Sequence, residues 1–522
     1  MKKYSILLLT VAMVAAASLA IQAQEVQRNP IVVHAAHITT AVPLRDMAPV
    51  PWHNLSKVMP EHDRAPKSHI GTGPDTVLQT EILPQVSTTN LLNFDGITDA
   101  QGGGFVPPDT NASVGATQVV ETVNVAYAVY DKATGGQIMA PKSIQTLYTP
   151  LGGQCATGNL SDPVVNYDKA AGRWVITMIA FNNTFSQNNA CVAVSTSSDA
   201  TGTYHVYSFS FGNVLPDYPK VGVWPDAYYV TTDSFPNGGA FTGAETCALD
   251  RTNMLLGNAA TAICFQRGTS DFALLPADLD GSTAPPSGAP NYQMDLATST
   301  KVNLYQFHVN FSVPSSSTFT GPVQLTVASY TDACASTGDC IPQPRPGELL
   351  DALGDRLMFR LAYRNFGDHE ALVASHSIKG SGTTTSAARW YEFRSPGSSP
   401  VVFQSGTVSG ASGVALWMGS IAMDKVGDIA LGYSKSSKSL DPSIEYAGRV
   451  PTDALGTMES PSTIITGTGV QRSSQHRWGD YSSMAIDPVD DCTFWYAQEY
   501  YKTTGSFNFS TRLASFKFNT CQ

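Results

Sequence analysis

The sequence predicts an all-β fold, a β-propeller of seven four-stranded blades. The first observation is a repeated unit, in which an aspartate opens a short apolar strand and a second apolar strand follows after a turn. The first four opening aspartates, Asp109, Asp162, Asp217 and Asp271, are 53, 55 and 54 residues apart. The second is sparse charge, 14% of the chain against roughly 25% in an average protein, which suits strands better than surface helices. Periods of this size are typical of propeller blades.

The repeat becomes uneven in the second half of the chain. Further units open at Asp355 and Asp480, and a unit that begins at Trp417 has lost the opening acid. Six or eight blades are therefore the alternatives to seven. A closed ring needs a strand from the other end of the chain. We expect TNLLNF, from Thr89, to complete the last blade and so remove a free sheet edge.

The N-terminal residues are predicted to direct export. Lys2 and Lys3 precede an apolar stretch over residues 6–20, and small residues end it, so residues 1–23 are predicted to be a signal peptide. Residues 24–90 are expected to be an extended or disordered leader, with a folding pro-segment as the alternative. Residues 91–522 are assigned to the propeller. No later stretch predicts a transmembrane segment, so the mature chain is expected to be secreted or periplasmic.

Charge and cysteine content narrow the partners and the compartment. Removal of the signal peptide leaves 29 basic residues against 42 acidic ones, a net charge of −13, which argues against nucleic acid and favours an extracellular glycan or protein as the partner. Eight cysteines in an exported chain without C-x-x-C predict disulfides. Sequence alone cannot assign the connectivity. Our hypothesis is sequential pairing, namely Cys155 with Cys191, Cys247 with Cys264, Cys334 with Cys340 and Cys492 with Cys521.

The opening aspartates are the first candidate site. If each begins an innermost strand, the ring brings together Asp109, Asp162, Asp217, Asp271, Asp355 and Asp480 at one mouth of the channel. They would accept backbone N–H groups, bind a hard cation such as Ca²⁺, or act on a substrate. The candidate catalytic residues are Asp109, Asp162, Asp217 and Asp480, with Tyr481 and Arg356. Asp278 and Asp280 resemble part of a Ca²⁺ loop and are the candidate metal ligands.

Two further polar clusters are possible sites. Arg356, Arg360 and Arg364 share one face of a predicted strand, where they would neutralise aspartates of neighbouring blades or clamp a carboxylate. The run 367–370, GDHE, is expected in the turn between two strands, on the face opposite the aspartate ring.

Aromatic residues flank the predicted inner strands. Trp417 and Trp478 precede two of these strands, and Tyr218 and Tyr481 follow two of the aspartates. Rings beside carboxylates are suited to sugar binding, so these four are the candidate ligand-binding residues. Packing between blades is the alternative.

Two hairpins, NYDKAAGRW from Asn166 and AMDKVGDIAL from Ala422, resemble a degenerate Asp-box, the motif of sialidase-like propellers. Together with PPDTN, DYPKVGVWPDAYY, FRLAYRNFGDHE and RWGDYSSMAIDPVDDCTFWY, they resemble a family of secreted bacterial propellers, over about residues 90–522. The resemblance implies a fold and a compartment. It implies no catalytic residue, because no chemistry is attached to that family.

The sequence therefore predicts an exported propeller that binds an extracellular glycan or protein at an acidic, aromatic funnel mouth. A glycoside hydrolase of sialidase-like type is the alternative, and a structural or adhesive surface protein without catalysis is the second alternative. Motifs such as G-x-S-x-G and H-E-x-x-H are absent, which disfavours serine hydrolases and zinc proteases. Two facing carboxylates in a deep funnel would favour an enzyme, and a channel plugged by Arg–Asp pairs would favour a scaffold.

Overall fold

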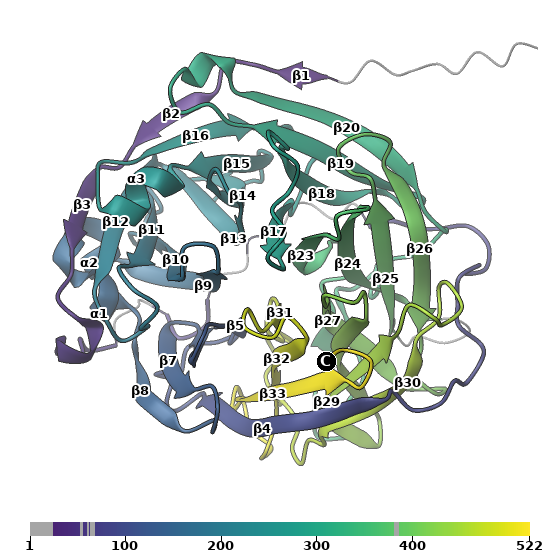
Figure 1. Cartoon of the computed structure of the whole chain (residues 1–522). Coiled ribbons are helices and arrows are strands. Elements are labelled where there is room, and N and C mark those ends of the chain that lie inside the picture. The colour runs from purple at the N-terminus through teal and green to yellow at the C-terminus, as the bar shows by residue number, and fades with distance from the viewer. Residues whose placement is uncertain (1–24, 53–55, 60–61, 63–67, 381–385) are drawn as a thin grey trace, which may run out of the picture.

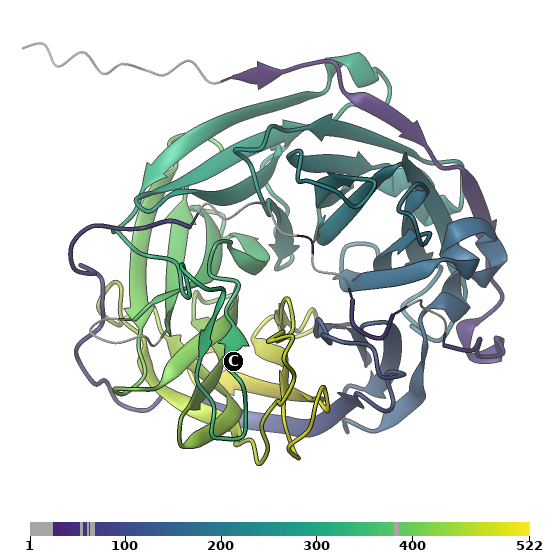
Figure 2. The same ribbon diagram turned by 180° about the vertical axis from the view of Figure 1, so that it is seen from behind.

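The computed structural model describes residues 25–52, 56–59, 62, 68–380 and 386–522, so the predicted signal peptide lies outside the described residues. The chain forms a ring of antiparallel sheets, shown from its two faces in Figures 1 and 2, and the centre of this ring, which the inner strands surround, is here called the channel. Short strands rich in apolar and aromatic side chains alternate with turns, as the repeat predicted. The protein is an all-β propeller.

Within the described residues, the hydrogen-bonded strands fall into seven antiparallel units of four, here called blades 1 to 7. Blades 1 to 3 contain β5 (Asn111–Val114), β6 (Gln118–Val123), β7 (Ala126–Asp131) and β8 (Gln137–Ser143); β9 (Asn159–Asp168), β10 (Arg173–Phe181), β11 (Asn188–Ser195) and β12 (Tyr204–Gly212); and β13 (Val214–Val223), β14 (Tyr228–Pro236), β15 (Ala244–Leu249) and β16 (Thr261–Gln266). Blades 4 and 5 contain β17 (Leu275–Asp280), β18 (Asn291–Thr298), β19 (Lys301–His308) and β20 (Thr318–Thr326); and β23 (Met358–Asn365), β24 (Glu370–Lys379), β25 (Ser386–Arg394) and β26 (Val401–Val408). Blades 6 and 7 contain β27 (Ala415–Met423), β28 (Ile429–Ser437), β29 (Leu440–Arg449) and β30 (Glu459–Ile465); and β31 (Ser483–Ile486), β32 (Thr493–Tyr500), β33 (Ser510–Phe518) and β4 (Thr88–Thr98).

Short elements fill the connections. They are η1 (Leu44–Asp46), α1 (Gln145–Tyr148), η2 (Thr149–Leu151), α2 (Gly153–Thr157), α3 (Arg251–Leu256), η3 (Pro314–Ser316), β21 (Asp339–Ile341) and β22 (Leu350–Asp351). Among the described residues, no helix has the length and apolar character that crossing a membrane requires.

The ring is closed by strands from opposite ends of the chain. Strand β4 lies antiparallel to β33, with Phe94 opposite Leu513, and forms the outer strand of blade 7 (Figure 1). This confirms the closing strand predicted at Thr89, which begins one residue earlier. Blades 4 and 5 are also joined at the channel, where β17 and β23 pair in parallel.

The leader is extended where it is described, and it also pairs with the propeller. Strands β1 (Val26–Gln27), β2 (Ile31–His34) and β3 (His37–Thr40) add outer strands to blades 4, 3 and 2 through β20, β16 and β12. The sequence did not indicate this pairing. These runs are only two to four residues long, and their partners are the exposed edges of sheets formed far along the chain.

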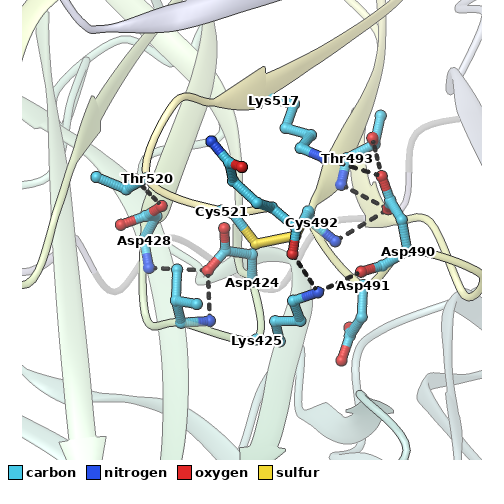
Figure 3. Close-up of a disulfide and its surroundings, with 12 residues drawn as sticks. Asp424, Lys425, Asp428, Asp490, Asp491, Cys492, Thr493, Lys517, Thr520 and Cys521 are labelled. Atoms are coloured by element: carbon cyan, nitrogen blue, oxygen red, sulfur yellow. Dashed lines mark hydrogen bonds and ion pairs between the residues drawn. A yellow bond between two sulfur atoms is a disulfide. The ribbon is translucent and has the colours of Figure 1, made fainter.

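All four predicted disulfides are present, Cys155–Cys191, Cys247–Cys264, Cys334–Cys340 and Cys492–Cys521. Figure 3 shows the last of these beside the turn of blade 6. There the Lys425 Nζ donates to the carbonyl oxygens of Gln522 (2.8 Å) and Asp490 (3.2 Å). The Asp424 carboxylate accepts backbone N–H bonds from Val426 and Asp428 within its own turn. Blades 6 and 7 are thus fastened together where the chain ends.

Candidate functional site

Three arginines of one inner strand mark three levels of the channel. Arg356, just before β23, pairs with Asp355 (2.8 Å), and Arg360 within β23 pairs with Asp278 and Asp280 of blade 4 (2.7 Å each). Arg364 makes a two-pronged pair with Asp491 of blade 7 (2.7 and 2.8 Å). The predicted neutralisation of aspartates in a neighbouring blade is found for Arg360, whereas Arg356 pairs within its own blade and Arg364 pairs with blade 7. The arginines separate an acid mouth, at the beginnings of the inner strands, from an open mouth at their ends.

The acid mouth is lined by Asp109, Asp162, Asp217, Asp480, Tyr218 and Arg356, all of them predicted site residues, together with Arg477, Leu353, Met59 and His62. Oxygens of Asp109, Asp162 and Asp480 lie within 4.8 Å of one another. Asn124 links two of these residues, because its Nδ2 donates to Asp109 Oδ2 (2.6 Å) and its Oδ1 accepts from the Asp162 N–H (2.8 Å). The predicted convergence is therefore found for four of the six aspartates.

The backbone places Asp271 differently from Asp109 and Asp162. At or near the start of the inner strand, blades 1 to 4 and 6 have a residue of positive φ, and Asp109 (49°) and Asp162 (54°) occupy this position in blades 1 and 2. In blade 4 the position falls on Ala273 (49°), two residues after Asp271, which pairs instead with Arg267 (2.8 Å). The prediction for Asp271 is wrong by this shift. Asp355 lines an adjoining cavity of about 340 Å³, which the Cys334–Cys340 loop also borders.

Burial and like charge perturb the acid mouth. Burial, followed by the charges of Asp217 and Asp480, raises the pKa of Asp162 to about 7. Burial also raises the pKa of Asp109 well above its usual value, and the charges of Asp480 and Asp162 add to this shift. Below them lies Lys220, whose ammonium is 3.3 Å from the Tyr218 ring centre and 4.2 Å from that of Tyr481. Burial lowers the pKa of Lys220 to about 8.

The acid mouth has little room for a ligand. Its cavity measures about 20 Å³, on the scale of a single water molecule. Two leader residues line it: the His62 Nδ1 lies 3.3 Å from Asp217 Oδ2, and the Met59 N–H donates to the Val106 carbonyl (2.8 Å). Arg477 pairs with Asp480 (2.6 Å). The calcium hypothesis for this ring stays a prediction.

The predicted ligand-binding aromatic residues are not exposed. Trp417 and Trp478 are 0% and 1% exposed and pack on each other with ring centres 5.5 Å apart, where blades 6 and 7 meet. Tyr218 and Tyr481 are also buried, and their hydroxyls donate to the carbonyls of Asp480 and Pro163. The sugar-stacking prediction is wrong for the two tryptophans because blade packing covers both indoles.

The middle of the channel is plugged by charge pairs. Arg360 holds Asp278 and Asp280, and the Lys169 Nζ lies 3.5 Å from Asp280. Burial would raise the pKa of Asp280, but the positive charges of Arg360 and Lys169 outweigh it and lower that pKa. The prediction of Asp278 and Asp280 as calcium ligands is corrected, because the Arg360 guanidinium takes the place of a cation between them.

The GDHE run lies in the turn between β23 and β24, as predicted. Asp368 contacts His369 (2.7 Å), and His369 stacks on Phe366. Glu370 accepts the Tyr363 hydroxyl (2.7 Å). These contacts are all local to the turn and its flanking strands, as a structural role requires.

The open mouth holds the larger cavity, about 390 Å³. Turns that follow the inner strands of blades 2, 3, 4 and 7 form it, and α3 contributes one residue. Its apolar wall includes Trp224, Leu279 and Val489, and its polar groups are Asp168, Lys169, Arg251 and Asp491. Sequence reasoning missed this site, because these residues come from turns that differ between blades. The only signal was the aspartate that ends a strand in NYDKAAGRW.

Local contacts fix the polar groups of the open mouth. Arg251 donates from Nε (2.7 Å) and Nη2 (3.0 Å) to the Asp168 carboxylate, which also accepts the Tyr228 hydroxyl (2.9 Å). The carboxylate of Asp250 caps α3 and so positions Arg251 at its first residue. Gly281 has φ of 76°, and a Cβ there would lie 2.6 Å from Arg364 Nη1. Glycine is therefore needed where the chain crosses this guanidinium.

No protein-family model and no curated protein matches the chain. Solved structures similar to it include an α-L-arabinanase from Penicillium chrysogenum (8% identity, TM-score 0.37, covering 84% of this chain and 99% of that one). An α-L-arabinofuranosidase from Fusarium graminearum is 8% identical with a TM-score of 0.35, and the match covers 84% of this chain and 99% of that one. A sialidase from Trypanosoma rangeli is 12% identical with a TM-score of 0.32, and the match covers 70% of this chain and 55% of that one. Likenesses of this size carry no argument about what this chain binds.

Proposed function

We propose that the protein is an exported β-propeller that binds an extracellular glycan at the open mouth. The cavity of about 390 Å³ carries this proposal, since small-ligand sites are concave, measure about 300 to 1,000 Å³ and combine apolar walls with a few fixed polar groups. Trp224, Leu279 and Val489 supply the apolar wall. The partly exposed Arg251 and Asp491 offer a fixed donor and a fixed acceptor to sugar hydroxyls.

Two features support export. The four disulfides are typical of oxidising compartments, and they use all eight cysteines. The charged n-region and short apolar stretch of residues 1–23 fit a signal peptide. A protein ligand would favour a broad surface rather than a recess, so the concave open mouth favours a glycan over a protein.

Hydrolysis at the acid mouth is the second candidate. The convergence of Asp109, Asp162 and Asp480, with two raised pKa values, favours acid–base chemistry. Glycosidase carboxylates, however, are about 5 to 9 Å apart, with the sugar between them. The oxygens here lie within 4.8 Å, and the cavity is about 20 Å³. The geometry therefore favours binding without hydrolysis.

A pure scaffold is the third candidate. The Arg360 pairs plug the middle of the channel, as a scaffold would require. They leave the open mouth accessible, however, and a scaffold needs no such cavity.

The test is a glycan array and calorimetry on the mature chain with two matched variants. Ser282 and Ser336 are both exposed and line cavities of about 390 and 340 Å³ at opposite mouths. We expect Ser282→Trp to abolish glycan binding and Ser336→Trp to preserve it, with the same Tm for both. Wild-type protein that binds no glycan, or Ser282→Trp that binds normally, would refute the proposal.

A further inference from the structure

The charged groups at the open mouth balance one another. Three carboxylates and three cations line the cavity or pair directly with its lining: Asp168, Asp280, Asp491, Lys169, Arg251 and Arg364. Within the described part of this mouth, the sum of formal charges on these groups is zero. The acid mouth shows no such balance.

Each pair is close and largely shielded from solvent. Arg251 and Asp168 meet at 2.7 Å with side chains 13% and 0% exposed, and Arg364 meets Asp491 at 2.7 Å with 5% and 21% exposed. Breaking a buried pair of this kind leaves an uncompensated charge, at a cost of about 3–5 kcal/mol. A ligand carboxylate would have to displace Asp168 or Asp491 from its arginine to gain a cation of its own.

A sugar hydroxyl can bind without displacing either aspartate from its arginine. The Asp491 carboxylate is 21% exposed and keeps lone pairs beyond the two that Arg364 uses, so a hydroxyl can donate to it while it accepts from a neighbouring N–H. We infer that the open mouth selects an uncharged, hydroxyl-rich glycan and rejects the same glycan when it carries a carboxylate. This inference rests on the proposed function, and it gives the class of glycan.

Binding of gluco-, manno- and galactotetraose is compared with that of their C6-oxidised uronate forms by calorimetry, in 20 mM and 500 mM NaCl. We expect at least one neutral tetraose to bind about tenfold or more tightly than its uronate, because the uronate finds no uncompensated cation. The affinity for the neutral tetraose should change less than about twofold between the two salt concentrations, because the cavity carries no net charge and neither does the sugar.

A charge-unbalancing variant sharpens the test. Asp491→Asn leaves Arg364 without its carboxylate, and asparagine tolerates the positive φ of 55° at this position. It should raise affinity for the uronates about tenfold, with a salt dependence that the wild type lacks. Asp490→Asn changes the preceding residue of the same turn, which does not line the cavity, and should leave both affinities as in the wild type.

The outcomes separate the two claims. Uronates that bind the wild type as tightly as the neutral tetraoses would overturn the inference and leave glycan binding standing. An Asp491→Asn variant that unfolds at the wild-type Tm but gains no uronate affinity would also overturn it. If none of the six probes binds, the proposed function fails for these sugars and the inference fails with it.

Discussion

The two mouths of the channel use charge in opposite ways. At the acid mouth, the four carboxylates of Asp109, Asp162, Asp217 and Asp480 come from four blades, and the cavity between them measures about 20 Å³. At the open mouth, Arg251 pairs with Asp168 and Arg364 pairs with Asp491, and the cavity is about 390 Å³. At the acid mouth, where carboxylates outnumber the arginines, the side chains of Arg356, Arg477 and His62 fill the space beside them. Convergence of titratable residues alone therefore does not locate the ligand in this molecule.

The two mouths are separate because the ion pairs of Arg360 with Asp278 and Asp280 form a wall across the channel. Replacing Arg360 by methionine leaves Asp278 and Asp280 buried without their guanidinium, and should lower the free energy of unfolding by about 3–5 kcal/mol. Denaturant titration measures this loss. Arg45→Met, which breaks the exposed pair with Asp199, is the control and should cost less than about 1 kcal/mol.

The triple variant Arg360→Met, Asp278→Asn, Asp280→Asn removes the orphaned charges as well. It should recover a large part of the lost stability. If Arg360→Met costs no more than Arg45→Met, the charge pairs do not form the wall between the mouths.

One disulfide, here called a staple, lies near each mouth of the channel. Cys492–Cys521 adjoins Asp491 at the open mouth, and Cys334–Cys340 borders the cavity beside the acid mouth. Their sequence separations of 29 and 6 residues predict losses of about 3.6 and 2.2 kcal/mol when each pair is changed to serine. Calorimetric unfolding tests this order.

Glycan affinity should follow only one of the two staples. The Cys492→Ser, Cys521→Ser variant loosens the turn that carries Asp491 and should weaken binding, while the Cys334→Ser, Cys340→Ser variant should not. Equal losses of affinity in both variants would contradict the assignment of the site to the open mouth.

The acid mouth should make the stability of the protein depend on pH. Because the pKa of Asp162 is raised to about 7 in the folded state, the folded chain binds more protons than the unfolded chain between about pH 4 and 7. Stability should therefore fall as pH rises through this window. Asp162→Asn should reduce that fall by about 3 kcal/mol, measured as the difference in unfolding free energy between pH 4.5 and 7.5.

The Asp424 carboxylate is a useful counterpart. Burial and the charge of Asp428 raise its pKa to about 8, so its titration extends to higher pH and should persist unchanged in the Asp162→Asn variant. A variant whose pH profile matched that of the wild type would show that Asp162 is not the group that titrates.

Much of the fold could be predicted from sequence because it depends on local order. The closing strand at Thr89 and the face shared by Arg356, Arg360 and Arg364 follow from repeat spacing and strand alternation. The exact level of each aspartate could not be predicted, because a two-residue shift at Ala273 removes Asp271 from the ring. Trp417 and Trp478 were wrongly predicted to bind a ligand, because the exposure of their side chains depends on how neighbouring blades pack. Trp224 and Arg251 were missed because they lie in turns without a repeat.

Closure of blade 7 has a consequence for biosynthesis. Strand β4 emerges early from the ribosome, but its partner β33 is nine residues long and arrives last, with Asn93 and Arg512 separated by 419 residues. The entropy of closing so long a loop is compensated only when β33 is present. A growing chain therefore carries β4 unpaired until β33 has been made. The ring can close only after that point, and a truncation that removes β33 should leave an open, aggregation-prone chain.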